Sequence, residues 1–153
     1  MPPLLDEILR AVFGSFLGTV GFAMLVHVPR RSWLVSGVIA ALSYLVFWGL
    51  ARLGFPEEIG IFCGALFGSL VGLFSARHMK MIGTIFLMSA IVPVVPGLGL
   101  YRMMAFLGQG RISEGAGMGV RVMITIAMIA LGLGAGSMID RLLHARSGRN
   151  HHI

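Results

Sequence analysis

Residues 81–107 read MIGTIFLMSAIVPVVPGLGLYRMMAFL, an apolar run interrupted near its centre by Pro93, Pro96 and Gly97. The run is long enough to cross a bilayer as a helix, which takes ~20 apolar residues. Each proline lacks a backbone N–H and clashes with the preceding turn, so the sequence predicts a helix broken at residues 93–97. Backbone groups freed inside hydrocarbon are tolerated only beside protein or a water-filled cavity. Transporters place substrate sites at such breaks near the middle of the membrane, so the stretch predicts a transport function.

The composition is that of a membrane protein. Of the 153 residues, 57% are hydrophobic and 12% are charged, whereas soluble chains are ~45–50% apolar and ~25% charged. The net charge of +6 would indicate nucleic-acid binding if the basic residues lay on one face of a soluble fold. Here the basic residues fall between apolar runs, where they act as topology signals. We therefore expect contact with the lipid bilayer and no nucleic-acid partner.

Five apolar segments are predicted to be membrane-spanning helices, because an open strand edge cannot face lipid. They cover residues 4–26, 33–50, 59–76, 81–107 and 118–139. The expected fold class is an all-α integral membrane protein of about five transmembrane helices, the fourth broken between Pro93 and Gly97. The connections, including a glycine-rich loop over residues 108–117, leave no room for a second domain. We expect one transmembrane domain over residues 1–153, ending in a polar cytoplasmic tail over residues 141–153.

The basic residues also predict an orientation, because cytoplasmic connections carry an excess of Lys and Arg. Five crossings place the two termini on opposite sides. One side collects seven basic residues, which are Arg30, Arg31, Arg77, Lys80, Arg141, Arg146 and Arg149. The other side collects five, which are Arg10, Arg52, Arg102, Arg111 and Arg121. We therefore expect the N-terminus outside and the C-terminus in the cytoplasm.

Regularly spaced glycines predict where helices pack closely. Gly64, Gly68 and Gly72 stand four residues apart and share one face of the third helix. Small residues at this spacing let a second helix approach, and glycine carries no side-chain chemistry, so we interpret the three as helix-packing positions. Two further pairs are interpreted in the same way, Gly14 with Gly18 and Gly132 with Gly136.

Few polar side chains lie where a substrate pathway would need them. Arg102, and Arg121 in the expected first turn of the fifth helix, would hold an anionic substrate group through their guanidinium groups. The alternative is that both side chains snorkel to the membrane interface. Ser89 and Tyr44 offer hydroxyl groups at the depth of the break. Ser89 would otherwise bond its own backbone, and Tyr44 would otherwise pack among helices.

Catalytic and metal-binding machinery is not visible in the sequence. No acidic residue is expected deep within a crossing, where a coupled carrier usually holds one. His27, His78 and His144 show no spacing that would bring them together with further metal ligands. No nucleophile, acid and base fall at one membrane depth. We therefore expect no enzyme activity, no metal and no cofactor.

Two stretches resemble a known family. GFAMLVHVP at residues 21–29 and IVPVVPGLGLY at residues 91–101 resemble the small membrane subunit of the threonine/serine exporter superfamily, in its split two-component form. The likeness in hydropathy and segment order runs from about residue 10 to residue 140. It implies a half-transporter of the bacterial inner membrane that works with a larger membrane subunit. It also implies export of small polar metabolites, either threonine and serine or a dicarboxylate such as succinate.

The resemblance matches this sequence at a set of motif positions. The positions that match its motifs are Gly21, Phe22, Ala23, Pro29, Pro93, Pro96, Gly97 and Tyr101. Backbone groups of the break are expected to face the substrate, at Pro93, Val94, Val95, Pro96 and Gly97, with Tyr101 and His27 as further candidates. His27 stands where a small polar residue is expected, and Arg102 where an uncharged one is usual. Because Arg102 is a cation, the substrate is either a zwitterion or a more anionic molecule. The alternative function is a membrane scaffold that transports nothing.

Overall fold

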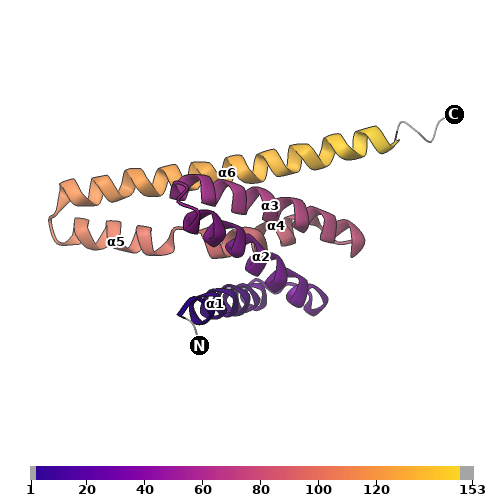
Figure 1. Ribbon diagram of the computed structural model, residues 1–153, viewed down its shortest axis with the longest axis horizontal. Helices are drawn as coiled ribbons and strands as arrows, with labels where there is room; N and C mark the ends of the chain where they lie inside the picture. Colours follow the sequence, from indigo (N-terminus) through magenta and orange to yellow (C-terminus); the bar gives the residue numbers. More distant parts are fainter. Residues whose placement is uncertain (1–2, 149–153) are drawn as a thin grey trace.

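The computed structural model describes residues 3–148 and shows only helices and their connections over that range (Figure 1). The elements are α1 (Pro3–Leu25), the 3₁₀ turn η1 (Arg30–Ser32), α2 (Trp33–Arg52), α3 (Glu57–His78), α4 (Gly83–Ile91), the 3₁₀ turn η2 (Val92–Val94), α5 (Gly97–Gly108) and α6 (Ile112–Gly148). Helices α1, α2, α3 and α6 are each long and apolar enough to cross a membrane. The segments 83–94 and 97–108 supply a fifth crossing if they form one span, bent by 55°. The predicted all-α membrane fold with a broken fourth helix is confirmed.

Helix α3 lies at the centre of the bundle, where it packs against α2, α4 and α6. The three spaced glycines face two of these helices. A Cβ atom added to Gly64 would lie 3.0 Å from the Ser43 carbonyl oxygen, and one added to Gly68 would lie 2.8 Å from Ala90 Cβ. At Gly72 the neighbour is the backbone of Phe86, at 3.3 Å. The absence of side chains therefore sets how closely α2 and α4 approach α3.

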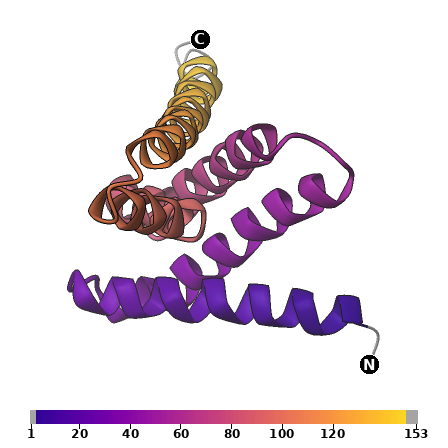
Figure 2. The same cartoon turned by 90° about the vertical axis from the view of Figure 1, so that its left-hand side faces the viewer.

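Helix α1 lies outside this bundle, across α2 (Figure 2). Phe16 covers Gly37 of α2, where an added Cβ atom would come within 2.5 Å of the phenyl ring. The expected packing role of Gly14 and Gly18 is wrong within this chain, because no atom lies within 4 Å of a Cβ atom added at either position. The glycine face of α1 thus points away from the other helices.

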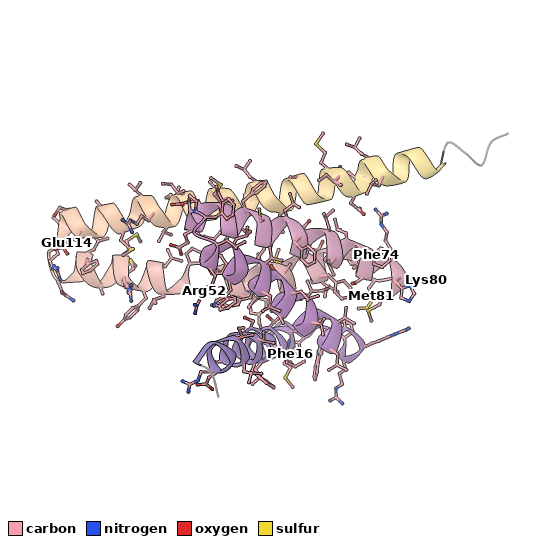
Figure 3. The ribbon with its side chains drawn as sticks, in the orientation of Figure 1. Phe16, Arg52, Phe74, Lys80, Met81 and Glu114 are labelled. Atoms are coloured by element: carbon pink, nitrogen blue, oxygen red, sulfur yellow. The ribbon has the colours of Figure 1, made fainter. Side chains whose placement is uncertain are left out.

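Helices α5 and α6 form a long hairpin that reaches past the ends of α2 and α3. Figure 3 shows Glu114 at the tip of this hairpin and Lys80 at the far end of the bundle, with Arg52 between them along the long axis. The 37 residues of α6 span ~55 Å, well beyond the ~30 Å of a hydrocarbon core. Its first part runs antiparallel to α5, and its later part runs beside α3.

The predicted glycine-rich loop at residues 108–117 is wrong, and so is the expected start of the last helix at residue 118. The connection is only the short turn between Gly108 and Ile112. Gly115 and Gly119 lie within α6 and face α5. Added Cβ atoms would lie 2.7 Å from Leu107 Cδ2 and 3.2 Å from Met103 Sδ, respectively. The low intrinsic helix propensity of glycine is overridden here by the contact between α5 and α6.

The ends of the bundle carry the charged groups. Arg77 of α3 forms an ion pair with Asp140 of α6, whose side chain is 12% exposed. Asp140 was expected at the end of the last helix, but α6 continues beyond it to Gly148, through residues 141–148 of the expected tail. Residues 149–153, which include Arg149, lie outside the described residues.

Candidate functional site

The helix break is built by its two prolines. After η2 the chain is extended at Val95, with ψ of 129°, and α5 starts at Gly97. The Val95 N–H donates to the Ile91 carbonyl at 3.0 Å, and the Gly97 N–H donates to the Val95 carbonyl at 2.8 Å. Proline has no N–H, so the backbone carbonyls four positions earlier, at Ser89 and Val92, lack the usual helical hydrogen bond.

The start of α5 presents free donors at the break. Among the described residues, no backbone acceptor binds the N–H groups of Leu98 and Gly99. The residue before the helix, Pro96, makes no capping bond with its side chain. Unbonded N–H groups and the helix dipole make such an end attractive to anions.

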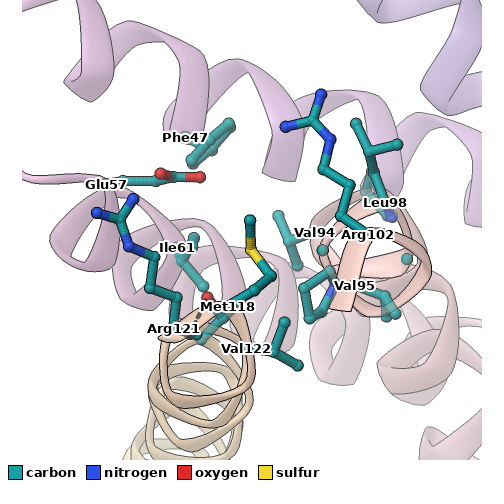
Figure 4. Close-up of a pocket in the computed structure, with 15 residues that line it drawn as sticks. Phe47, Glu57, Ile61, Val94, Val95, Leu98, Arg102, Met118, Arg121 and Val122 are labelled. Carbon is teal, nitrogen blue, oxygen red and sulfur yellow. Dashed lines mark hydrogen bonds between the residues drawn. The ribbon is translucent and has the colours of Figure 1, made fainter. Parts of the chain in front are cut away.

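A cavity of about 360 Å³ opens at the break (Figure 4). This volume lies near the lower end of the range for small-molecule sites, ~300–1,000 Å³. The lining residues come from α2, α3, the break, α5 and α6, and they are Phe47, Glu57, Ile61, Pro93, Val94, Val95, Pro96, Gly97, Leu98, Gly99, Arg102, Met118, Arg121, Val122 and Thr125. The five backbone positions predicted for the pathway therefore line one cavity together with Arg102 and Arg121.

The cavity lies toward one end of the bundle. Its α3 residues are Glu57 and Ile61, which belong to the first turns of that helix. Below it, Val94 packs against Ile61, Ala65 and Ile129 in a buried apolar cluster. The break therefore lies level with the first turns of α3. Its position near the middle of the membrane stays a prediction.

Three charged side chains surround the cavity. Arg102 comes from α5, Arg121 from α6 and Glu57 from the first turn of α3. In the view of Figure 4 the Glu57 carboxylate lies between the two guanidinium groups. Among the described residues, none of the three forms an ion pair within 4.0 Å. The charges of the cavity are therefore available to a ligand.

Four predicted pathway residues do not line this cavity. Ser89 is buried, and its hydroxyl donates to the Ile85 carbonyl at 2.9 Å, the backbone bond weighed as its alternative. The Tyr44 ring packs against the Phe47 ring, with centroids 5.7 Å apart. This is the packing among helices that was the alternative to a pathway role. Tyr101 is 71% exposed on the outside of α5. His27 is exposed in the connection after α1, at φ of 58°.

Sequence reasoning missed Glu57 as a cavity residue. It lies before the predicted third segment, which begins at residue 59, whereas in the structure it opens α3 directly after Pro56. The available signal was an acidic side chain beside a proline at a helix start, which by itself is typical of many helices.

Within the described residues no three His, Cys, Asp or Glu side chains are grouped as a metal site would need.

Comparison with known families decides what kind of protein carries this cavity. The sequence matches the threonine/serine exporter family, ThrE, over residues 11–139. The chain belongs to this family. The match spans most of the described helices, including the break, Arg102 and Arg121, and it confirms the exporter superfamily to which the sequence showed a resemblance. No solved structure matches the chain. The exporter-family member is thus a multi-pass membrane protein with a transport role of the threonine/serine exporter type.

Proposed function

We propose that this exporter-family chain is one subunit of an export system for small carboxylate-bearing metabolites. The candidate substrates are threonine and serine, or a dicarboxylate such as succinate. The observation that supports this most is the cavity at the break, where Arg102 and Arg121 from two helices face one space of about 360 Å³. We place the system in the bacterial inner membrane, with the N-terminus outside and the C-terminus in the cytoplasm.

Two features favour a carboxylate in this cavity. Guanidinium groups form short, charge-assisted hydrogen bonds with carboxylates, frequently in bidentate pairs. The start of α5, with its free N–H groups at Leu98 and Gly99, adds a positive helix end. Such an end contributes ~0.3–1 kcal/mol when exposed and up to ~2 kcal/mol when partly buried. Together these groups would replace water around the substrate carboxylate while it lies in the cavity.

The chain is proposed to work with a larger membrane subunit of the same superfamily. All 12 residues of α5 are described, and none is buried, although α5 lines the cavity. The glycine face of α1 is also open, at Gly14 and Gly18. An odd number of crossings would let two related units sit with opposite topology, as inverted-repeat carriers require. A second subunit would close the cavity and cover these faces.

The alternative, a scaffold that transports nothing, accounts for the glycine contacts of α3 but not for the cavity. A scaffold needs neither a proline-broken helix nor two arginines beside the break. Charged side chains at such sites in membranes usually mark substrate pathways.

The test is efflux from cells that express this chain together with the larger subunit and are loaded with labelled threonine, serine or succinate. Arg102→Gln and Arg121→Gln should each reduce efflux, because a charge-assisted bond of ~1.5–3 kcal/mol corresponds to about 10- to 100-fold in affinity. Arg102→Gln should reduce succinate efflux more than threonine efflux if the arginine guides an anion. Arg141→Gln, on α6 but away from the cavity, is the matched control. Wild-type efflux in both cavity variants would contradict the proposed site and return the arginines to a snorkelling role.

A further inference from the structure

We propose that Glu57 is the specificity-determining residue of this cavity and that it accepts the ammonium group of a zwitterionic α-amino acid. The inference rests on the proposed function, in which Arg102 and Arg121 hold the substrate carboxylate. It adds a second recognition group and decides between the two substrate classes left open by the arginines.

The position of Glu57 supports this role. Its side chain lines the same cavity as the two arginines but comes from a different helix, α3. In Figure 4 the carboxylate points into the space between the two guanidinium groups. Among the described residues it has no ion-pair partner within 4.0 Å, although two cations share its cavity. The arrangement therefore leaves one acceptor for a cation and two donors for an anion.

This set of charges matches a zwitterion better than a dicarboxylate. An α-amino acid carries its ammonium and carboxylate groups on one carbon atom, so one molecule can meet an arginine and Glu57 together. A dicarboxylate held by Arg102 or Arg121 would bring its second carboxylate toward Glu57, and like charges repel strongly where water is scarce. Rejection of a competitor through an unfavourable contact is a common source of specificity.

A simpler role for Glu57 must be separated from this one. Acidic residues in the first turn of a helix stabilise it through the helix dipole, and both Glu57 and Glu58 occupy that turn of α3. Only Glu57 lines the cavity. Glu58 is therefore a matched control, because it shares the helix position and the charge but not the contact with a substrate.

The experiment compares efflux of threonine with efflux of 3-hydroxybutyrate, which is threonine without its amino group, in cells expressing the chain with the larger subunit. Glu57→Gln should lower threonine efflux about 10- to 100-fold, the effect of one lost charge-assisted bond. It should leave 3-hydroxybutyrate efflux unchanged, so the ratio of the two rates falls. Glu58→Gln should keep the wild-type ratio. Glu57→Lys should go further and favour succinate over threonine. Membrane abundance of each variant is measured so that rates are compared per molecule.

Two outcomes overturn the inference. One is a wild-type threonine preference in both Glu57→Gln and Glu57→Lys while Arg121→Gln is impaired, in which case the proposed site stands and Glu57 serves only the helix. The other is an equal loss of preference in Glu58→Gln, which would assign the effect to the helix start. Wild-type efflux in Arg102→Gln and Arg121→Gln would instead contradict the proposed function itself.

Discussion

Asp140 and Arg77 illustrate how the environment of each partner decides the energetics of an ion pair. The Asp140 side chain is 12% exposed, whereas that of Arg77 is 40% exposed. Arg77→Gln removes a cationic partner from a carboxylate that water hardly reaches, which costs ~1–3 kcal/mol. Asp140→Asn leaves an arginine that water can solvate and an amide that can still accept its hydrogen bond. Thermal unfolding in detergent should therefore show a larger loss of stability for Arg77→Gln than for Asp140→Asn. The reverse order would show that the pair is solvated in the folded protein.

The residue scale also shows what the sequence could not provide. Glu57, Arg102 and Arg121 are separated along the chain by 45 and 19 residues and belong to three helices, as their positions in the sequence show. The two arginines stood out because a charge near a broken membrane helix is costly. Glu57 did not, because an acidic residue at a helix start has an ordinary explanation. Only the packing of α3 beside the break brings the three together.

At the scale of elements, two glycines of α6 provide a matched test of helix contact. A Cβ atom added at Gly132 would lie 2.7 Å from the Phe62 carbonyl oxygen. A Cβ atom added at Gly134 would have no neighbouring atom within 4 Å. Gly132→Ala must move α6 away from the backbone of α3, and overpacking of this kind costs ~1–3 kcal/mol. Gly134→Ala should be neutral or stabilising by up to ~1 kcal/mol, because alanine favours the helix. Unfolding in detergent measures both, and equal effects would contradict the observed contact.

The broken helix yields a second prediction at this scale. Pro93→Ala with Pro96→Ala restores two backbone donors and removes the penalty of ~3 kcal/mol or more that each proline would impose on a continuous helix. The 55° bend between the segments 83–94 and 97–108 should straighten. The cavity should then lose the wall that residues 93–97 form. We expect efflux to be abolished while the protein still assembles with its partner, which co-purification checks. Wild-type efflux in the double variant would show that the break is only a kink.

Elements were predictable from the sequence where one physical signal dominated. Long apolar runs predicted four uninterrupted helices, and prolines predicted the position of the break. The start of α6 was missed because Gly115 was interpreted as a loop residue. In water, glycine lowers helix stability. In a membrane the same residue lets α5 approach α6, and the sequence alone does not show which helix will be the neighbour.

For the whole molecule, the distribution of basic residues predicts which end faces the cytoplasm. Arg77 and Lys80 lie at one end of the bundle, and Gln109 lies at the tip of the hairpin beyond the other end. Because cytoplasmic connections are enriched in Lys and Arg, the end with Lys80 should face the cytoplasm and the hairpin tip should face outward. Both ends are tested with single cysteines, since Cys63 is the only cysteine of the chain and Cys63→Ala provides the background.

In intact cells a membrane-impermeant thiol reagent should label Gln109→Cys but not Lys80→Cys, because the exposed hairpin tip alone would be reachable from outside. Lys80→Cys should become labelled after the membrane is permeabilised, which controls for its accessibility. The opposite pattern would reverse the orientation. It would then place the mouth of the cavity, which lies at the hairpin end of the bundle, on the side from which an exporter collects its substrate rather than the side on which it releases it.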